Sequence, residues 1–130
     1  MDPNGIVADE PTSDLDPVHS RWIESVLVDL KTNYGMSVVT TTHDMDLAAR
    51  LADRIYVLAE GKVISEGKPS DIFYDKAILK RAGLEQPAAV RIYESLRKDH
   101  SLADERPVQE HDLIEILLSC LRAPKCEDRT

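Results

Sequence analysis

The sequence predicts an α/β fold in which a parallel sheet is flanked by helices. Short apolar or β-branched runs alternate with amphipathic helical patterns, in the order strand, helix, strand, helix, strand. Hydrophobic residues make up 42% and charged residues 31% of the chain, as is usual for a globular protein. A length of 130 residues is enough for one modest domain with its own core.

Residues 5–8 are predicted to form the first strand, because GIVA is an apolar run typical of a buried parallel strand. Pro11 has no backbone donor and ends the pairing soon afterwards. A helix is predicted from Asp16 and Pro17 to about residue 33, since Asp suits the N-cap and Pro the first helical position. Its apolar stripe is expected to face the core and consists of Val18, Trp22, Ile23, Val26, Leu27 and Leu30.

The second strand is predicted at residues 37–42, where the sequence SVVTTT is rich in β-branched residues. His43 follows this strand directly, and Asp44 is a suitable cap for a short helix after it. A third strand is expected at residues 55–58. A turn after it makes residues 62–65 its antiparallel partner.

The rest of the chain is predicted to be helical. Ser70 is expected to cap a helical turn, and further helices are expected at residues 75–82 and 87–98. Residues 99–107 are polar and are predicted to form a linker. The final helix is predicted at residues 108–122, with an apolar stripe of Leu113, Ile114, Leu117, Leu118 and Leu121.

Charge and hydropathy exclude several classes of function. The net charge is -8 and the pI about 4.9, so no basic stripe is available to bind nucleic acid or anionic lipid. No apolar run approaches the roughly 20 residues that a membrane span needs, and the first five residues are unlike a signal peptide. Any association with a membrane is therefore expected to go through a partner.

The two cysteines do not predict a metal site. Cys120 and Cys126 are separated by five residues, which is not a usual zinc spacing. Binding of a metal by His111 together with both cysteines is the less favoured alternative to two reduced thiols. Cys120 lies within the apolar pattern of the final helix and is expected to pack as a small hydrophobic residue.

Polar residues follow the first two predicted strands. Asp9 and Glu10 come at the end of the first strand, and His43 and Asp44 come after the second. The carboxyl ends of neighbouring parallel strands meet at one edge of a sheet, where ligands bind. Taken singly, each of these residues is more typical of a surface, turn or cap position, so the hypothesis of a site depends on their combination.

This combination suits magnesium and a phosphate substrate. Asp9 offers the oxygen ligand that Mg²⁺ prefers, and Glu10 offers a base that orients or deprotonates an attacking water. His43 offers a hydrogen-bond donor for a phosphoryl oxygen as charge builds there.

The order and spacing of these motifs resemble the ABC-type ATPases. Residues 6–12, IVADEPT, resemble the Walker B segment, and residues 13–16, SDLD, resemble the D-loop that follows it. Residues 41–44, TTHD, resemble the switch-histidine region, and residues 61–69 resemble the hairpin that closes the ATPase fold. The resemblance extends from residue 1 to about residue 87. It implies a partial P-loop NTPase sheet with flanking helices, which is followed at residues 88–130 by a helical extension.

The resemblance also implies roles for individual residues. Asp9 would coordinate Mg²⁺ through water, Glu10 would polarise the hydrolytic water, and His43 would contact the γ-phosphate of ATP. The D-loop would act at the interface between two ATPase subunits that enclose two ATP molecules, through Ser13, Asp14, Leu15 and Asp16. Such subunits bind membrane permease subunits at the cytoplasmic face of the membrane and drive solute transport.

A weaker resemblance concerns the residues after the hairpin. Ile72-Phe73, the segment 82–84 and Pro87 resemble the tail of ATPases from cobalt and energy-coupling-factor importers. This similarity implies import of cobalt or a related nutrient.

Two motifs that complete an ABC ATPase are absent from these 130 residues. A Walker A loop needs Gly-x-x-x-x-Gly-Lys-[Ser/Thr], but Gly61-Lys62 is followed by Val and Gly67-Lys68 by Pro. No Gly-Gly pair is present, so the signature loop is absent as well. We therefore expect a truncated ATPase domain that hydrolyses no ATP by itself, with an open edge on the strand at residues 37–42.

Two other hypotheses stay open. The chain is in one case a non-catalytic remnant of an ATPase, with intact local motifs and no turnover. In the other case it is an interaction module that docks on a partner through the apolar stripe of the helix at residues 108–122, although packing of that stripe inside the domain is the simpler interpretation.

Overall fold

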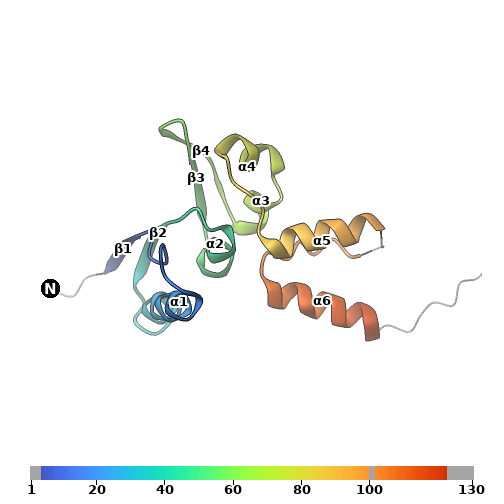
Figure 1. The fold of residues 1–130 in the computed structure, drawn as a ribbon, viewed down its shortest axis with the longest axis horizontal. Coiled ribbons are helices and arrows are strands. Elements are labelled where there is room, and N and C mark those ends of the chain that lie inside the picture. The colour runs from blue at the N-terminus through green and yellow to red at the C-terminus, as the bar shows by residue number, and fades with distance from the viewer. Residues whose placement is uncertain (1–3, 100–101, 123–130) are drawn as a thin grey trace, which may run out of the picture. The chain divides into compact units, whose positions relative to one another are not determined.

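The computed structural model describes residues 4–99 and 102–122, and the chain divides into two units, residues 1–53 and 54–130 (Figure 1). The mixture of helices and strands agrees with the predicted α/β class. The described strands form two separate two-stranded sheets, one in each unit. The third strand therefore does not extend the first parallel sheet. The predicted boundary at residue 87 stays a prediction.

The first unit contains a strand–helix–strand–helix sequence. Its elements are β1 (Gly5–Asp9), α1 (Pro17–Thr32), β2 (Ser37–Thr41) and α2 (Met45–Leu51). β1 and β2 are parallel and pair in register along their full length, with α1 packed along β2. The predicted parallel pairing of the first two strands is confirmed, and Figure 1 shows the two strands side by side.

Carboxylates start both helices of this unit. Asp16 is the N-cap of α1 and accepts a hydrogen bond from the backbone N–H of His19, and Asp44 is the N-cap of α2. Both caps agree with the sequence prediction. Arg50 of α2 donates two hydrogen bonds to Glu24 of α1, at 2.6 and 3.2 Å, and this forked ion pair ties the helices together.

The apolar stripe of α1 is only partly buried. Leu27 is buried, and Ile23 and Leu30 are half-buried, as expected. Val18 and Trp22 are 75% and 63% exposed, so the prediction that they face the core is wrong for the described structure. Within its unit α1 packs on β2 and α2. The apolar stripe of α1 is wide, and a sheet of only two strands is too narrow to cover all of it.

The second unit begins with an antiparallel hairpin and continues with helices. Its elements are β3 (Ile55–Ala59), β4 (Lys62–Gly67), α3 (Pro69–Phe73), α4 (Lys76–Ala82), α5 (Ala88–Asp99) and α6 (Glu110–Arg122). The predicted hairpin and the predicted helices are confirmed. Gly83 ends α4 at a φ of 71°, a left-handed conformation that glycine adopts without the steric cost of a side chain.

The start of α3 differs from the prediction. Ser70 lies inside this helix and does not cap it, because Pro69 occupies the first helical position and Lys68 is the N-cap. Proline has a φ suited to the first turn, and it has no N–H that would need a partner there, so the helix starts two residues earlier than predicted. The helix then buries Ile72 and Phe73.

A cluster around Tyr93 forms the core between α5 and α6. Tyr93 packs with Ala89 and Leu113, and the ring of Tyr74 meets it edge-on at 6.2 Å. The hydroxyl of Tyr93 donates to the carbonyl of Ala103, so the segment predicted as a linker is held against α5. Burial raises the pKa of Tyr74, which keeps its hydroxyl protonated, and that hydroxyl donates to the carbonyl of Pro107 at 2.6 Å.

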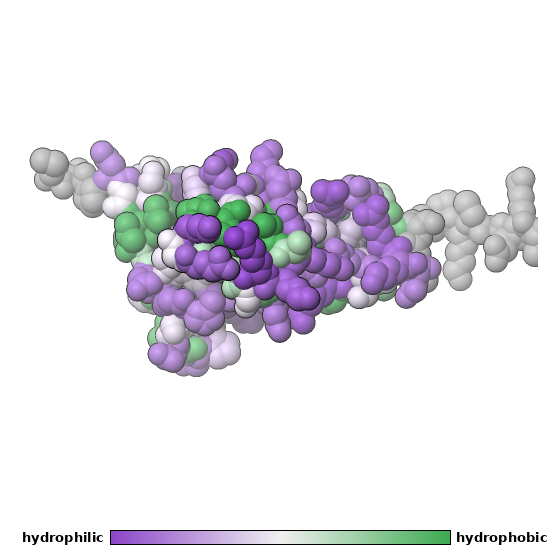
Figure 2. Space-filling model, turned by 90° about the horizontal axis from the view of Figure 1, so that it is seen from above, coloured by the Kyte–Doolittle hydropathy of each residue, from purple (hydrophilic) through white to green (hydrophobic). Residues whose placement is uncertain are grey.

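Hydrophobic side chains also reach the surface, as the green regions in Figure 2 show. Cys120 is exposed near the end of α6, so the expectation that it packs as a small hydrophobic residue is wrong. Cys120 follows Leu113 by seven residues and Leu117 by three, so it lies on the same helix face, but among the described residues the Tyr93 cluster includes these two leucines and not Cys120.

Candidate functional site

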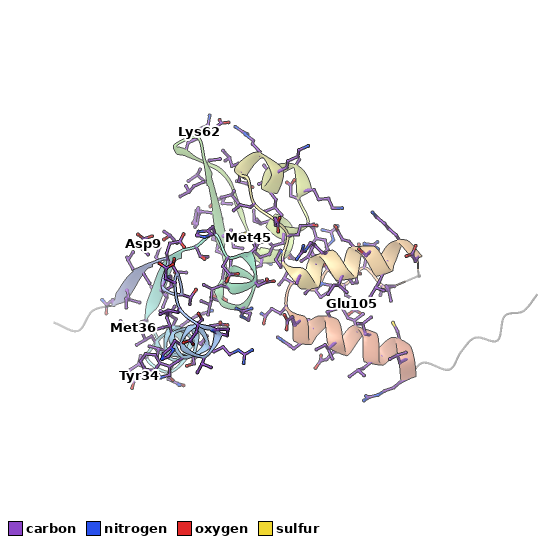
Figure 3. The ribbon with its side chains drawn as sticks, in the orientation of Figure 1. Asp9, Tyr34, Met36, Met45, Lys62 and Glu105 are labelled. Carbon is purple, nitrogen blue, oxygen red and sulfur yellow. The ribbon has the colours of Figure 1, made fainter. Side chains whose placement is uncertain are left out.

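The candidate site lies at the carboxyl ends of β1 and β2. The parallel register places Asp9 directly opposite Thr41, the last residue of β2. Glu10 continues from β1 and His43 follows β2, so both residues lie in the segments that leave the sheet at this edge. Figure 3 labels Asp9, the last residue of β1, and Met45, the first residue of α2.

Glu10 and His43 are in direct contact. The Nδ1 atom of His43 lies 2.7 Å from Oε1 of Glu10, across 33 positions of sequence. The Glu10 side chain is 36% exposed and the His43 side chain 77% exposed, so both remain accessible to a ligand from solvent. The expectation that the two polar strand ends converge is thus confirmed, whereas the catalytic roles of the residues stay predictions.

The backbone of Glu10 adopts a left-handed conformation with a φ of 47°. Such a conformation costs a non-glycine residue about 1 kcal/mol or more, and it persists only where surrounding contacts hold it. The amide of Glu10 is close to two acceptors of Thr41, the carbonyl oxygen at 2.9 Å and the hydroxyl oxygen at 3.2 Å. These bonds fix the point at which the chain turns away from β1, and therefore the direction of the Glu10 side chain.

Thr41 connects the Asp9 carboxylate with the backbone amide of Glu10. Its hydroxyl donates to Oδ1 of Asp9 and accepts from the amide of Glu10. One side chain on β2 therefore orients the last residue of β1 and the residue after it. In the sequence, Thr41 stands out only as part of the TTHD motif. The predicted parallel pairing could have revealed the contact between Thr41 and Asp9. A threonine opposite an aspartate at the ends of two paired strands places a hydroxyl beside a carboxylate.

The segment after Glu10 forms a tight turn that leads into α1. The amide of Ser13 donates to the carbonyl of Glu10 at 3.1 Å, and Asp14 has a φ of 63°. Asp16 closes the turn, with Leu15 exposed beside it. The pKa of the Asp16 carboxyl lies below its usual range, first because the backbone N–H of His19 donates to it and second because the His19 ring does so. A dimer contact through this turn stays a prediction.

Asp44 has a structural role in α2. Its carboxylate accepts hydrogen bonds from the backbone N–H groups of Asp46 and Leu47, at 3.0 and 3.1 Å. These bonds satisfy two of the open donors in the first turn of the helix. The start of α2 is thereby set directly after His43, which limits how far the His43 backbone can move.

The donor set fits magnesium only together with a phosphate ligand. Among residues 4–99 and 102–122, no group of three or more His, Cys, Asp and Glu side chains is arranged to hold a metal. Mg²⁺ in phosphate sites needs only one or two protein carboxylates, since phosphate oxygens and waters complete its shell. Exposed Asp9 fits that requirement. Of the alternative ligands, His111 and Cys120 belong to no such group, and Cys126 lies outside the described residues.

A helix that crosses a membrane needs about 20 consecutive, mostly apolar residues. Across the part of the chain that the structure describes, none of the helices has both the length and the apolar character that crossing a membrane requires.

Comparison with known proteins found relatives that cover most of this chain. The energy-coupling factor transporter ATP-binding protein EcfA of Methanocaldococcus jannaschii is 39% identical over 102 residues, which are 78% of this chain and 36% of that protein. A putative ABC transporter ATP-binding protein of Methanothermobacter thermautotrophicus is 40% identical over 107 residues, 82% of this chain and 38% of that protein. No family model matches the chain.

The fold of this chain is also similar to that of a solved structure. The chain resembles cbiO1 from Clostridium perfringens, described as part of the ABC transporter complex cbiONQ, with a TM-score of 0.52 and 30% identity. The match covers 73% of this chain and 37% of that one. The chain thus spans just over a third of the length of the relatives that it matches.

Proposed function

This chain is a homologue of the ATP-binding proteins of ABC transporters of the energy-coupling factor type, and on that premise we propose that it carries the water-activating half of an ATP hydrolysis site. The observation that supports this proposal is the 2.7 Å contact between Glu10 and His43 at the ends of two parallel strands. A carboxylate and an imidazole in contact make a pair that positions a water molecule and a phosphoryl oxygen next to each other.

In the proposed site Glu10 orients the attacking water and accepts its proton. The carboxylate is accessible, and its backbone is held by the two acceptors of Thr41, so its position is defined before a ligand binds. Preorganisation of this kind lowers the entropic cost of bringing a water molecule into line with the phosphorus atom.

The other two residues act on the phosphate. His43 donates a hydrogen bond to the γ-phosphate through Nε2, the ring nitrogen that does not contact Glu10. Asp9 would hold Mg²⁺ through water, and the Thr41 hydroxyl fixes one of the Asp9 carboxylate oxygens. The magnesium ion, when bound with ATP, supplies positive charge that offsets the charge developing on the phosphate oxygens.

The positive part of the site comes from residues outside these 130. A backbone cradle with a lysine is needed to hold the phosphates of ATP, and no Gly-x-x-x-x-Gly-Lys-[Ser/Thr] segment occurs in the sequence. The carboxylates described above have little affinity for a triphosphate by themselves, because like charges repel. We therefore propose that the chain hydrolyses ATP only together with such a cradle.

The physiological role that we propose is the energising of solute import. The named relatives are ATP-binding proteins of transporters, and one similar structure is part of a complex called cbiONQ. By that similarity the chain works at the cytoplasmic face of a membrane, bound to permease subunits and to a second ATPase subunit through the turn at Ser13, Asp14, Leu15 and Asp16. Cobalt or a related nutrient is the proposed solute.

A chimera tests the proposed chemistry. The segment of the M. jannaschii protein that matches this chain is replaced by the corresponding residues of the chain, and ATP hydrolysis is measured with Mg²⁺. We expect turnover in the chimera and a loss of about 100-fold or more in kcat with Glu10→Gln, as is typical when a general base is removed. ATP binding should remain, since the amide keeps the shape of the side chain.

Glu60→Gln is the matched control. Glu60 is also an exposed glutamate with a positive φ, 54°, and it pairs with Arg81 instead of a histidine. This variant should hydrolyse ATP as the parent chimera does. A chimera that folds and binds ATP but has no turnover would favour the non-catalytic alternative, and full activity in Glu10→Gln would refute the assigned role.

A further inference from the structure

Two ion pairs join α1 to α2 and the residues after it in the first unit. Arg50 of α2 reaches Glu24 of α1 with two nitrogen atoms, Nε at 2.6 Å and Nη2 at 3.2 Å. Further along both segments, the Nζ atom of Lys31 lies 2.5 Å from a carboxylate oxygen of Asp53, two residues after α2 ends. The two contacts follow each other in the same order along both segments, so the helices run side by side in the same direction.

These helices begin next to the candidate site. Asp16, the N-cap of α1, closes the turn that follows β1, and Asp44, the N-cap of α2, is the residue after His43. Glu24 lies eight residues beyond the first cap and Arg50 six beyond the second, or about 12 and 9 Å along a helix. A movement of α2 at Arg50 is therefore carried over less than two turns to the backbone of His43.

The forked pair is better placed than an ordinary surface ion pair to hold a helix. The side chain of Glu24 is only 16% exposed, and that of Arg50 is 41% exposed. Two bonds from one guanidinium fix the orientation of the partners as well as their distance, which a single bond from a lysine does not.

Other carboxylates lie near the guanidinium of Arg50. The pKa of Arg50 lies above its usual range, first because Glu24 accepts its hydrogen bonds and to a smaller extent because of the charges of Asp44 and Asp46. Asp46 is one helical turn before Arg50, on the same side of α2. Without Glu24 the guanidinium would turn toward these two residues, and one of them, Asp44, caps α2 beside His43.

We propose that Glu24 and Arg50 are positioning residues, which hold α2 against α1 and thereby keep the His43 ring beside Glu10 with Nε2 left for the phosphate. Both residues act through α2 and its start at Asp44, and not on the phosphate. This role rests on the proposed function for its kinetic consequence, whereas the position of His43 can be measured in the full chain without ATP.

Nuclear magnetic resonance of the full chain tests the position of His43. The ring ¹⁵N shifts report the contact of Nδ1 with Glu10, and Glu10→Ala gives the shifts of a ring without that contact. We expect Arg50→Ala and Glu24→Gln to move the ring shifts toward this reference. The charge-swapped variant, Glu24→Arg with Arg50→Glu, should move them back toward the parent chain.

Lys31→Ala is the matched control for the chain. It breaks the other ion pair between the same segments, about 10 Å further along α1 from the site, and should leave the ring shifts of His43 unchanged. Circular dichroism verifies that each variant is folded, and Arg50→Lys, which keeps the charge but not the fork, replaces Arg50→Ala if that variant does not fold.

Kinetics of the chimera described above test the consequence. Arg50→Ala should lower kcat about tenfold, because a small displacement of a group that contacts the phosphate is costly. The KM for ATP should change by less than about twofold, since the phosphate cradle is untouched. Arg54→Ala is the control, because Arg54 is an exposed arginine that pairs with a glutamate of the second unit, Glu66, at 3.0 Å.

Several results overturn the proposal. Ring shifts of His43 that Arg50→Ala leaves unchanged would show that the pair does not hold the ring. An equal change in Lys31→Ala would show a general loosening of the helices, and a folded charge-swapped variant that restores nothing would exclude the ion pair as the cause. A parent chimera without turnover counts against the proposed function alone, because the measurements on His43 still decide whether the pair positions it.

Discussion

The two units of the chain use different means to hold their shape. In the second unit a group of side chains is buried, namely Val57, Ile72, Phe73, Leu79, Ala89, Val90, Tyr93 and Leu113. Among the described residues of the first unit, the buried hydrophobic ones are Leu27, Leu47 and Ala49, while Val7, Trp22 and Val39 are exposed. Packing of buried side chains thus contributes most to the stability of the second unit. In the first unit a larger share comes from backbone pairing, helix caps and ion pairs.

The candidate site is in the unit with the smaller core. Its geometry depends on strand register and on the hydroxyl of Thr41, which are short-range and directional, and much less on buried apolar contacts. Hydrogen bonds contribute about 1 kcal/mol each to stability, and buried large side chains contribute several. We therefore expect the free energy of local unfolding to be lower for the first unit than for the second.

The largest effect is expected from Phe73→Ala in the second unit. Phe73 is fully buried at the end of α3, so its truncation should lower the free energy of unfolding by about 3 to 5 kcal/mol. Denaturant unfolding followed by circular dichroism measures the loss. Ile92→Ala is the control, because Ile92 is half-exposed on α5 and should cost less than about 1 kcal/mol.

A smaller effect is expected from Leu27→Ala in the first unit. Leu27 is buried, but it lies in a thin layer that can relax around the gap, so about 2 kcal/mol is expected. Amide hydrogen exchange measures this loss of stability, when it is followed separately for β1–β2 and for α5. Val28→Ala, at a more exposed neighbouring position, is the control. A cost equal to that of Phe73→Ala would contradict the difference between the units.

Thr41→Val should cost about 1 kcal/mol and change the site more than the fold, because it removes a hydroxyl from a hydrogen-bonded chain. The Glu10 amide keeps the carbonyl of Thr41 as an acceptor, but Asp9 loses its donor. The backbone coupling constant of Glu10, which reports φ, should move away from the left-handed value, and Thr41→Ser should restore it.

Thr40→Val is a second control for that experiment. Thr40 is the preceding residue of β2, and its buried hydroxyl has no hydrogen-bond partner among the described residues. Replacing it by the isosteric valine should leave stability unchanged or raise it, because no bond is lost and a desolvated hydroxyl is removed. A similar change in Glu10 from both variants would show that strand packing, and not the Thr41 hydroxyl, holds the site.

The smallest effect is a pH dependence at the start of α1. The pKa of Asp16 is lowered by the hydrogen bonds from His19, so the folded state favours the charged carboxylate. The stabilisation is present above the ordinary Asp range and is lost as the pH falls through the lowered pKa of the folded state. Hydrogen exchange of the first turn of α1 should show this loss, and Asp16→Asn should remove the pH dependence.

Local features of the fold were predictable from short stretches of sequence. Asp16, Asp44 and Asp75 cap the helices that follow them, and Gly83 ends α4, because a cap depends on the residues within one helical turn. The strand ends that carry Asp9 and His43 were predictable in the same way, from a change of apolar to polar residues. Lys68 was missed as the cap of α3 because the serine nearby has the stronger N-cap preference, while the neighbouring proline decides the start.

By itself the sequence determined the elements, the parallel pairing of the first two strands and the residues gathered at their ends. Only the tertiary structure decided that Thr41 joins Asp9 to the Glu10 amide, that Trp22 stays exposed, and that α6 has an inner and an outer face. The physical reason is the range of the interactions. Caps and periodicity act within a few residues, whereas burial and cross-strand hydrogen bonds depend on which segments, far apart in sequence, come to lie together.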